Sequence, residues 1–247
     1  MISGIRSLSS SHEQIVIGWT GDIAPPPSSA SASTSSVVTA GADKVPAYAI
    51  SQVDKAAFQD VLDPEDDRGE KRAKYLPVWL DDKVAHGHYD GYCKQALWPL
   101  FHYLLWQDVA TEYASADSHY PYYESANAAF ARRIAEVDQP GDIVGVHDYH
   151  LVLLPRLVRE SIPEVDLSLF VHTPFPSCEV FRCLPRRKEI LDGMLGADLV
   201  CFQTSYSPSF ISTCIRVCGY EASPSGIDVE GHVTAVSHCW CGCREGC

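Results

Sequence analysis

The sequence has few basic residues and no long apolar run. Of its 247 residues, 19 are Lys or Arg and 32 are Asp or Glu, so the formal net charge is -13 at pH 7. Because Lys and Arg form no stripe, we do not expect a nucleic-acid partner bound by phosphate neutralisation. No stretch reaches the about 18 apolar residues of a membrane-spanning helix, and residues 1–6 lack the apolar core of a signal peptide. The sequence therefore predicts neither a nucleic-acid interface nor a membrane partner.

Two fingerprints of common enzyme classes are also missing. The chain has no G-x-G-x-x-G or Walker-type loop, so no motif of this kind supports nucleotide binding. It has no G-x-S-x-G sequence, which removes the nucleophile elbow of many hydrolases. Any chemistry must come from residues that carry no such signature.

Cysteines are present but are unevenly distributed. Six are scattered through apolar segments, as reduced buried thiols are, which favours a cytoplasmic protein: Cys93, Cys178, Cys183, Cys201, Cys214 and Cys218. The other four stand in residues 239–247 with the spacing C-x-C-x-C-x3-C. Structural zinc sites use C-x2-C pairs, so zinc is the less favoured interpretation and we predict no metal site.

The chain divides into a loose first part and a regular second part. Residues 24–46 consist largely of Pro, Ser, Ala and Thr, which bury too little apolar surface to fold, so we expect a disordered insertion there. Elsewhere strands alternate with helices. Strands are expected at 15–19, 75–80, 143–146, 167–171 and 199–202, and helices at 124–137, 153–160, 186–195 and from Ser207, acting as cap before Pro208. This alternation predicts βαβ units, and hence an α/β, Rossmann-like parallel sheet with flanking helices.

The ends of these strands select candidate site residues. In a parallel sheet, ligands bind beyond the carboxyl ends of the strands. That position is taken by Trp19, Asp148, His172 and Gln203. Three of these four residues carry strong hydrogen-bonding groups, so we expect a polar ligand at this edge.

The box from His147 to His150 admits three interpretations. The Asp148 carboxylate is suited to accept hydrogen bonds from sugar hydroxyls. Alternatively, His147 and His150 have the spacing of two metal ligands on one helical face, although no third ligand is evident. Finally, Asp148 could simply cap the helix that follows.

Two further groups have equally open roles. His172 precedes two prolines that stiffen its loop, which suits a fixed imidazole facing a ligand, but also a buried structural histidine. The aromatic residues between Tyr89 and Tyr103, Trp98 among them, suit stacking on a sugar ring, but also an aromatic core. Basic residues at 182–188 suit a phosphate or a solvated helix face.

Taken together, five motifs resemble one family. They are Leu97–Tyr103, His147–His150, His172–Pro176, Phe181–Pro185 and Asp198–Thr204, in this order, with Ile17–Gly21 as an earlier match. The set is similar to the trehalose-6-phosphate synthase family, glycosyltransferase family 20, over about residues 75–239. The run from Phe181 to Gly196 is closest to fungal two-domain members, the trehalose-phosphatase or regulatory subunits of the synthase complex.

The resemblance implies a fold and a set of roles. The family has two Rossmann-like domains in the GT-B arrangement, and residues 1–239 resemble the N-terminal, acceptor-side domain. Tyr89, Trp98 and Asp148 match positions that hold glucose-6-phosphate, and Trp19 matches a residue lining the same pocket. His172 matches the histidine that contacts the donor glucose of UDP-glucose, acting by orientation and electrostatics; with Asp148 it forms the expected catalytic pair. The family transfers glucose with retention and needs neither a metal nor a cofactor.

Several departures from the family pattern shape the functional expectation. No Ser-Asn-Arg strand or Gly-Gly loop precedes Ile15, residues 240–247 form a Cys-rich tail where the family continues into the donor domain, and Gly145, Cys178 and Pro208-Ser209 are unusual. We therefore expect the chain to be inactive alone. The alternative is a non-catalytic module that binds other subunits of a trehalose synthase complex.

Overall fold

The computed structural model describes residues 13–21, 52–62, 73–104, 115 and 117–238. The chain forms two compact units, residues 1–82 and residues 83–247. The expected insertion at 24–46 and the tail at 240–247 lie outside the described residues. No helix among those residues is long and apolar enough to cross a bilayer.

The described residues of the first unit form two parallel strands and one helix. β1 (Ile15–Trp19) pairs with β2 (Lys74–Val78), and α2 (Gln52–Leu62) contacts β2. The Gln59 side chain donates a hydrogen bond of 2.8 Å to the carbonyl of Tyr75, and the Phe58 ring meets the Trp79 ring edge-on at 5.6 Å. Both strands were expected from their apolar runs, whereas α2 was not.

The second unit is built on a six-stranded sheet in the order β3-β4-β5-β8-β7-β6. The four parallel strands are β3 (Ile143–His147), β4 (Asp166–Val171), β5 (Leu199–Phe202) and β8 (His232–His238), and the antiparallel strands are β7 (Gly226–Val229) and β6 (Glu221–Ser223). The predicted parallel sheet is therefore confirmed. The hairpin that extends it beyond β5 was not expected.

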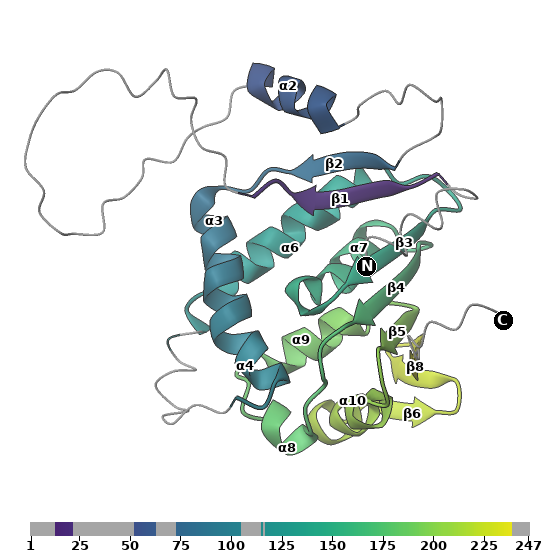
Figure 1. Cartoon of the computed structure of the whole chain (residues 1–247). Helices are drawn as coiled ribbons and strands as arrows, with labels where there is room; N and C mark the ends of the chain where they lie inside the picture. The colour runs from purple at the N-terminus through teal and green to yellow at the C-terminus, as the bar shows by residue number, and fades with distance from the viewer. Residues whose placement is uncertain (1–12, 22–51, 63–72, 105–114, 116, 239–247) are drawn as a thin grey trace, which may run out of the picture. The chain divides into compact units, whose positions relative to one another are not determined.

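Helices cover this sheet and its carboxyl edge. They are α3 (Asp82–His86), η2 (Gly87–Leu97), α4 (Trp98–Phe101), α6 (Tyr120–Ala135), η3 (Tyr149–Leu151), α7 (Leu154–Ser161), α8 (Cys178–Phe181), α9 (Arg187–Met194), α10 (Ser207–Thr213) and η4 (Cys214–Cys218). Of these, α6, α7 and α9 lie side by side, and α7 packs on β4 (Figure 1). On β4 the alternate residues Leu167, Leu169 and Val171 are buried, as a strand covered on one face requires.

Close contact between α7 and the segment after α9 depends on a glycine. A Cβ added to Gly196 would lie 2.4 Å from Cα of Arg156 in α7. Only a residue without a side chain lets the two backbones approach this closely. Two expectations need correction here. Ser207 is the first residue of α10 rather than its cap, since Tyr206 occupies the cap position, and Cys183 is exposed rather than buried, although all six described cysteines are free thiols.

Candidate functional site

The carboxyl ends of β3 and β4 bring polar side chains together. His147 ends β3 and pairs in register with Phe170, so Asp148 and His172 follow neighbouring strands at the same edge. The backbone N–H of His172 donates to Oδ1 of Asp148 at 3.3 Å, and the Thr173 hydroxyl donates to the same oxygen at 3.4 Å. We call His147, Asp148, His172 and Thr173 the strand-end cluster.

Asp148 holds an unusual backbone conformation. Its φ of 67° and ψ of 177° lie in a region that is populated almost only by glycine. Its own N–H donates to the carbonyl of Phe170 at 2.7 Å, one step beyond the β3–β4 ladder. Asp148 stands at the cap position of η3, but its side chain makes no capping hydrogen bond to that helix. The strained turn instead directs the carboxylate to the loop after β4.

His147 and His172 contact each other directly. Nδ1 of His147 lies 3.3 Å from Nε2 of His172, and the ring centroids are 5.5 Å apart. The Phe170 ring lies 4.5 Å from the His172 ring and 6.3 Å from the His147 ring. Burial and the nearby His172 lower the pKa of His147 below its usual value, which favours a neutral ring at pH 7.

The aromatic candidates join the cluster through Tyr149 and His150. The Tyr89 ring stacks on His150 at 5.7 Å, and Tyr149 and His150 are 4.1 Å apart. The Trp98 ring lies 6.1 Å from Tyr149. Tyr89 is 40% exposed and Trp98 is 42% exposed. Both residues are therefore partly exposed to solvent beside the residues that follow Asp148, so neither is simply an aromatic core residue.

Neighbouring side chains fix the positions of these aromatics. His102 donates from Nδ1 to the carbonyl of Trp98 at 2.8 Å, and its ring stacks on the indole at 3.7 Å. Lys94 places its Nζ 4.4 Å from the centre of the Tyr89 ring. The Tyr103 hydroxyl accepts a hydrogen bond of 2.8 Å from the N–H of Ser177, which ties η2 and α4 to the loop after His172.

A buried layer supports the turn that carries Asp148. Tyr123 is fully buried in α6; its hydroxyl donates to the carbonyl of Tyr149 at 2.7 Å and accepts from the N–H of Val152 at 3.2 Å. Nε2 of His88 donates to the carbonyl of His150 at 2.9 Å, and burial lowers the pKa of His88 to about 4. These side chains therefore bind backbone groups of η3 and of Val152, the residue that follows it.

The other expected residues lie elsewhere. Trp19 ends β1 in the first unit, and Gln203 is exposed directly after β5. The described residues supply no third ligand for His147 and His150, since they contain no group of three or more His, Cys, Asp or Glu residues that could hold a metal ion. The contacts of His147, His102 and Tyr103 were not expected from the sequence, although all three residues stand inside the quoted motifs.

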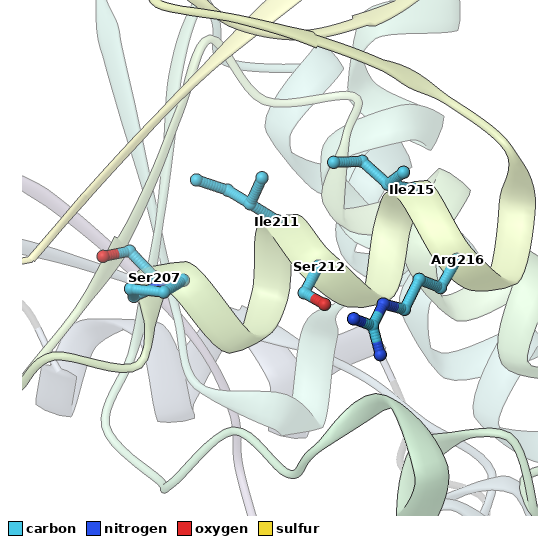
Figure 2. Close-up of a pocket in the computed structure, with 6 residues that line it drawn as sticks. Ser207, Ile211, Ser212, Ile215 and Arg216 are labelled. Atoms are coloured by element: carbon cyan, nitrogen blue, oxygen red, sulfur yellow. The ribbon is translucent and has the colours of Figure 1, made fainter.

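A separate groove runs along α10 and η4. It has a volume of about 470 Å³ and is lined by Ser207, Pro208, Ile211, Ser212, Ile215 and Arg216 (Figure 2). Its lining repeats every four residues along the helix, so the groove follows one helical face. None of its residues belongs to the strand-end cluster, and Arg216 is its one charged side chain. The clustered polar and aromatic candidates lie at the sheet edge instead.

Comparison with known proteins identifies a family model and relatives that agree with one another. The model of glycosyltransferase family 20 matches residues 28–243. The chain is 43% identical over 171 residues to an Arabidopsis thaliana alpha,alpha-trehalose-phosphate synthase [UDP-forming] 1, covering 68% of this chain and 18% of that protein. It is 40% identical over 164 residues to the Saccharomyces cerevisiae trehalose synthase complex regulatory subunit TPS3, covering 66% of this chain and 16% of that protein.

A solved structure agrees with these matches. The N-terminal domain of the Candida albicans trehalose-6-phosphate phosphatase superposes with a TM-score of 0.64 at 36% identity, covering 76% of this chain and 38% of that one. This chain thus spans well under half the length of each of these three proteins. Its fold is that of the Rossmann-like half of a GT-B enzyme, and the chain belongs to glycosyltransferase family 20.

Proposed function

We propose that residues 1–239 form the acceptor-side domain of a protein of trehalose biosynthesis, and that the strand-end cluster with Tyr89 and Trp98 binds glucose-6-phosphate. The observation that carries this proposal is the shared edge of β3 and β4. There the Asp148 carboxylate accepts from the backbone N–H of His172, and the half-exposed rings of Tyr89 and Trp98 contact His150 and Tyr149, which follow Asp148. The family match and the synthase relatives support the same substrate class.

Each group has a role that follows from its chemistry. A carboxylate accepts two or more hydrogen bonds, so Asp148 suits adjacent hydroxyls of a glucose ring. Tyr89 and Trp98 present aromatic surface to the apolar C–H face of the sugar, and their polar atoms suit its edge. His172, held beside Asp148, is the catalytic candidate that contacts the donor glucose. It orients the donor and balances developing charge, and it forms no covalent intermediate.

In the full reaction, glucose would pass from UDP-glucose to glucose-6-phosphate with retention, giving trehalose-6-phosphate and UDP. A polypeptide of these 247 residues spans 18% of the Arabidopsis enzyme. We therefore expect it to bind the acceptor but to release no UDP when both sugars are supplied.

Calorimetric titration of the chain with glucose-6-phosphate tests the acceptor site. The proposal predicts saturable binding that Asp148→Asn weakens at least tenfold, because the amide accepts fewer hydrogen bonds than the carboxylate. Asp166→Asn is the matched control: Asp166 is an exposed aspartate at the opposite, amino end of β4. Absence of binding by the unmodified chain, or equal losses in the two variants, would overturn the proposal.

A second candidate is a non-catalytic module of a trehalose synthase complex. It is favoured by the 36% identity to the domain from the Candida phosphatase and by the similarity to the yeast regulatory subunit. This function predicts that the chain co-purifies with a synthase subunit whether or not residue 148 is an aspartate. Failure to associate with such a subunit from the same organism would argue against it.

A further inference from the structure

The contact between His147 and His172 constrains both rings. A neutral imidazole has one N–H donor and one bare nitrogen acceptor, so a hydrogen bond between two neutral rings needs one nitrogen of each kind. The 3.3 Å separation joins Nδ1 of His147 to Nε2 of His172. With centroids 5.5 Å apart, the rings are too distant for face-to-face contact and meet through their nitrogen edges.

Only two proton arrangements satisfy this geometry. In the first, Nε2–H of His172 donates to bare Nδ1 of His147, and both rings carry their proton on Nε2. In the second, Nδ1–H of His147 donates to bare Nε2 of His172, and both rings carry their proton on Nδ1. The Nε2–H tautomer is the more stable form of a neutral imidazole, so the first arrangement places both rings in their preferred state.

The surroundings fix the rest of the His172 ring. Phe170 covers the ring at 4.5 Å, and the backbone N–H of His172 is held by Asp148 at 3.3 Å. Among the described residues no hydrogen-bond partner is present for Nδ1 of His172. That nitrogen is therefore left to a ligand, and under the first arrangement it is an acceptor.

We propose that His147 is a positioning residue: it accepts a hydrogen bond from Nε2–H of His172, so that bare Nδ1 of His172 accepts a hydrogen bond from a sugar hydroxyl. This inference rests on the proposed function: an acceptor sugar bound at Asp148 lies beside the ring that the donor glucose also contacts, so in the absence of the donor the hydroxyl belongs to the acceptor. It adds the direction of the hydrogen bond: Nδ1 of His172 accepts from the sugar hydroxyl and does not donate to it.

The test is ¹⁵N NMR of the histidine side chains in the whole 247-residue chain near neutral pH. We expect His172 to carry its proton on Nε2 and to show an Nε2–H that exchanges slowly with water. His147→Phe keeps a ring but removes the acceptor, so this protection should disappear. His147→Asn places an oxygen acceptor near the position of Nδ1, so the protection of Nε2–H of His172 from exchange should return.

The matched control is His232→Phe, since the His232 ring bonds the carbonyl of Ala197 near the amino ends of the strands. It should leave the His172 signals unchanged. A His172 ring protonated on Nδ1 in the unmodified chain would overturn the inference, as would an Nε2–H whose protection survives His147→Phe.

Titration with glucose-6-phosphate separates this inference from the proposed function. On binding, the Nδ1 signal of His172 should shift, and His147→Phe should weaken binding by about three- to tenfold, the scale of one hydrogen bond. Saturable binding that leaves Nδ1 of His172 unmoved would overturn the inference alone. Absence of any binding, with the Nε2–H tautomer and its protection intact, would instead overturn the proposed function.

Discussion

Replacing Asp148 by glycine should leave the folded chain more stable than replacing it by alanine. Elsewhere the order is normally the reverse, because glycine has more conformational freedom to lose on folding. The reason lies in the backbone at this residue, with φ of 67° and ψ of 177°. A residue with a Cβ pays about 1–3 kcal/mol to occupy that region, and glycine occupies it without strain.

The two substitutions isolate this strain. Both remove the carboxylate, so both lose the hydrogen bonds that Asp148 accepts from His172 and Thr173. They differ in the relief of strain, about 1–3 kcal/mol in favour of glycine, and in unfolded-state entropy, about 0.4–1 kcal/mol in favour of alanine. Taking the middle of each range, the net expectation is an advantage of about 1.3 kcal/mol for the glycine variant.

Equilibrium unfolding in urea measures the difference directly, as a higher midpoint for Asp148→Gly at an unchanged slope. In thermal unfolding, each kcal/mol corresponds to about 2–4 °C for a domain of 150–250 residues. The same pair of substitutions at Asp166, which is not among the residues with positive φ, should show alanine as the more stable variant. An Asp148→Ala variant as stable as Asp148→Gly, or more so, would refute the assignment of strain to this residue.

Three further changes test the surroundings of the site. Tyr123→Phe leaves a buried carbonyl and a buried N–H of the turn after β3 without their partner, so the free energy of unfolding should fall by about 1–3 kcal/mol; an unchanged value would contradict the supporting role. The pKa of His88 is 6.5 in the unfolded chain and about 4 in the fold because of burial. The unfolded state therefore binds the proton first, and unfolding free energy measured against pH should decline by up to about 3 kcal/mol between pH 6.5 and 4; an equal decline in His88→Asn would assign it to another group. Gly196→Ala should lower the midpoint of thermal unfolding by an amount equivalent to about 1–3 kcal/mol, because its Cβ would meet the backbone of α7 at 2.4 Å; Gly145→Ala, whose Cβ would meet only one side-chain atom at 4.0 Å, should not.

Three of the four parallel strands could be predicted from the sequence because they are short, largely apolar runs. Residues 143–146, 167–171 and 199–202 read as strands for this reason, and all three lie in β3, β4 and β5. The β6–β8 hairpin could not be found in the same way. β6 is three residues long and fully exposed, so the segment carries no apolar pattern that separates it from a loop.

No helix was predicted at η2 because its sequence has low helical propensity. Gly87 and Gly91 weaken helical propensity, and aromatic residues between them add little. The structure places both glycines against α6 and the residue before it: a Cβ at Gly87 would lie 2.3 Å from the Tyr122 ring, and one at Gly91 would lie 2.6 Å from the His119 ring. Tertiary packing therefore overrides local propensity here.

The candidate site was predictable in position but not in detail. That Asp148 and His172 lie together follows from one rule, since residues after neighbouring parallel strands share an edge. The contact between His147 and His172 depends on the register that pairs His147 with Phe170 and on two ring orientations. Neither the strand register nor the ring orientations can be deduced from the local sequence.

The strain at Asp148 supports the proposal that its carboxylate is functional. A sequence selected only for stability would place glycine where φ is 67°. Instead the surrounding structure forces the turn: the N–H of Asp148 is held by Phe170, and the two groups after it are held by the buried Tyr123 hydroxyl. Backbone strain of this kind persists only where the surrounding contacts hold the backbone in place. Positions where local conformational preference and the fold disagree are often functional sites. The conformation that destabilises residue 148 is also the one that brings its carboxylate to His172, so the stability lost there and the proposed sugar site have a single structural cause.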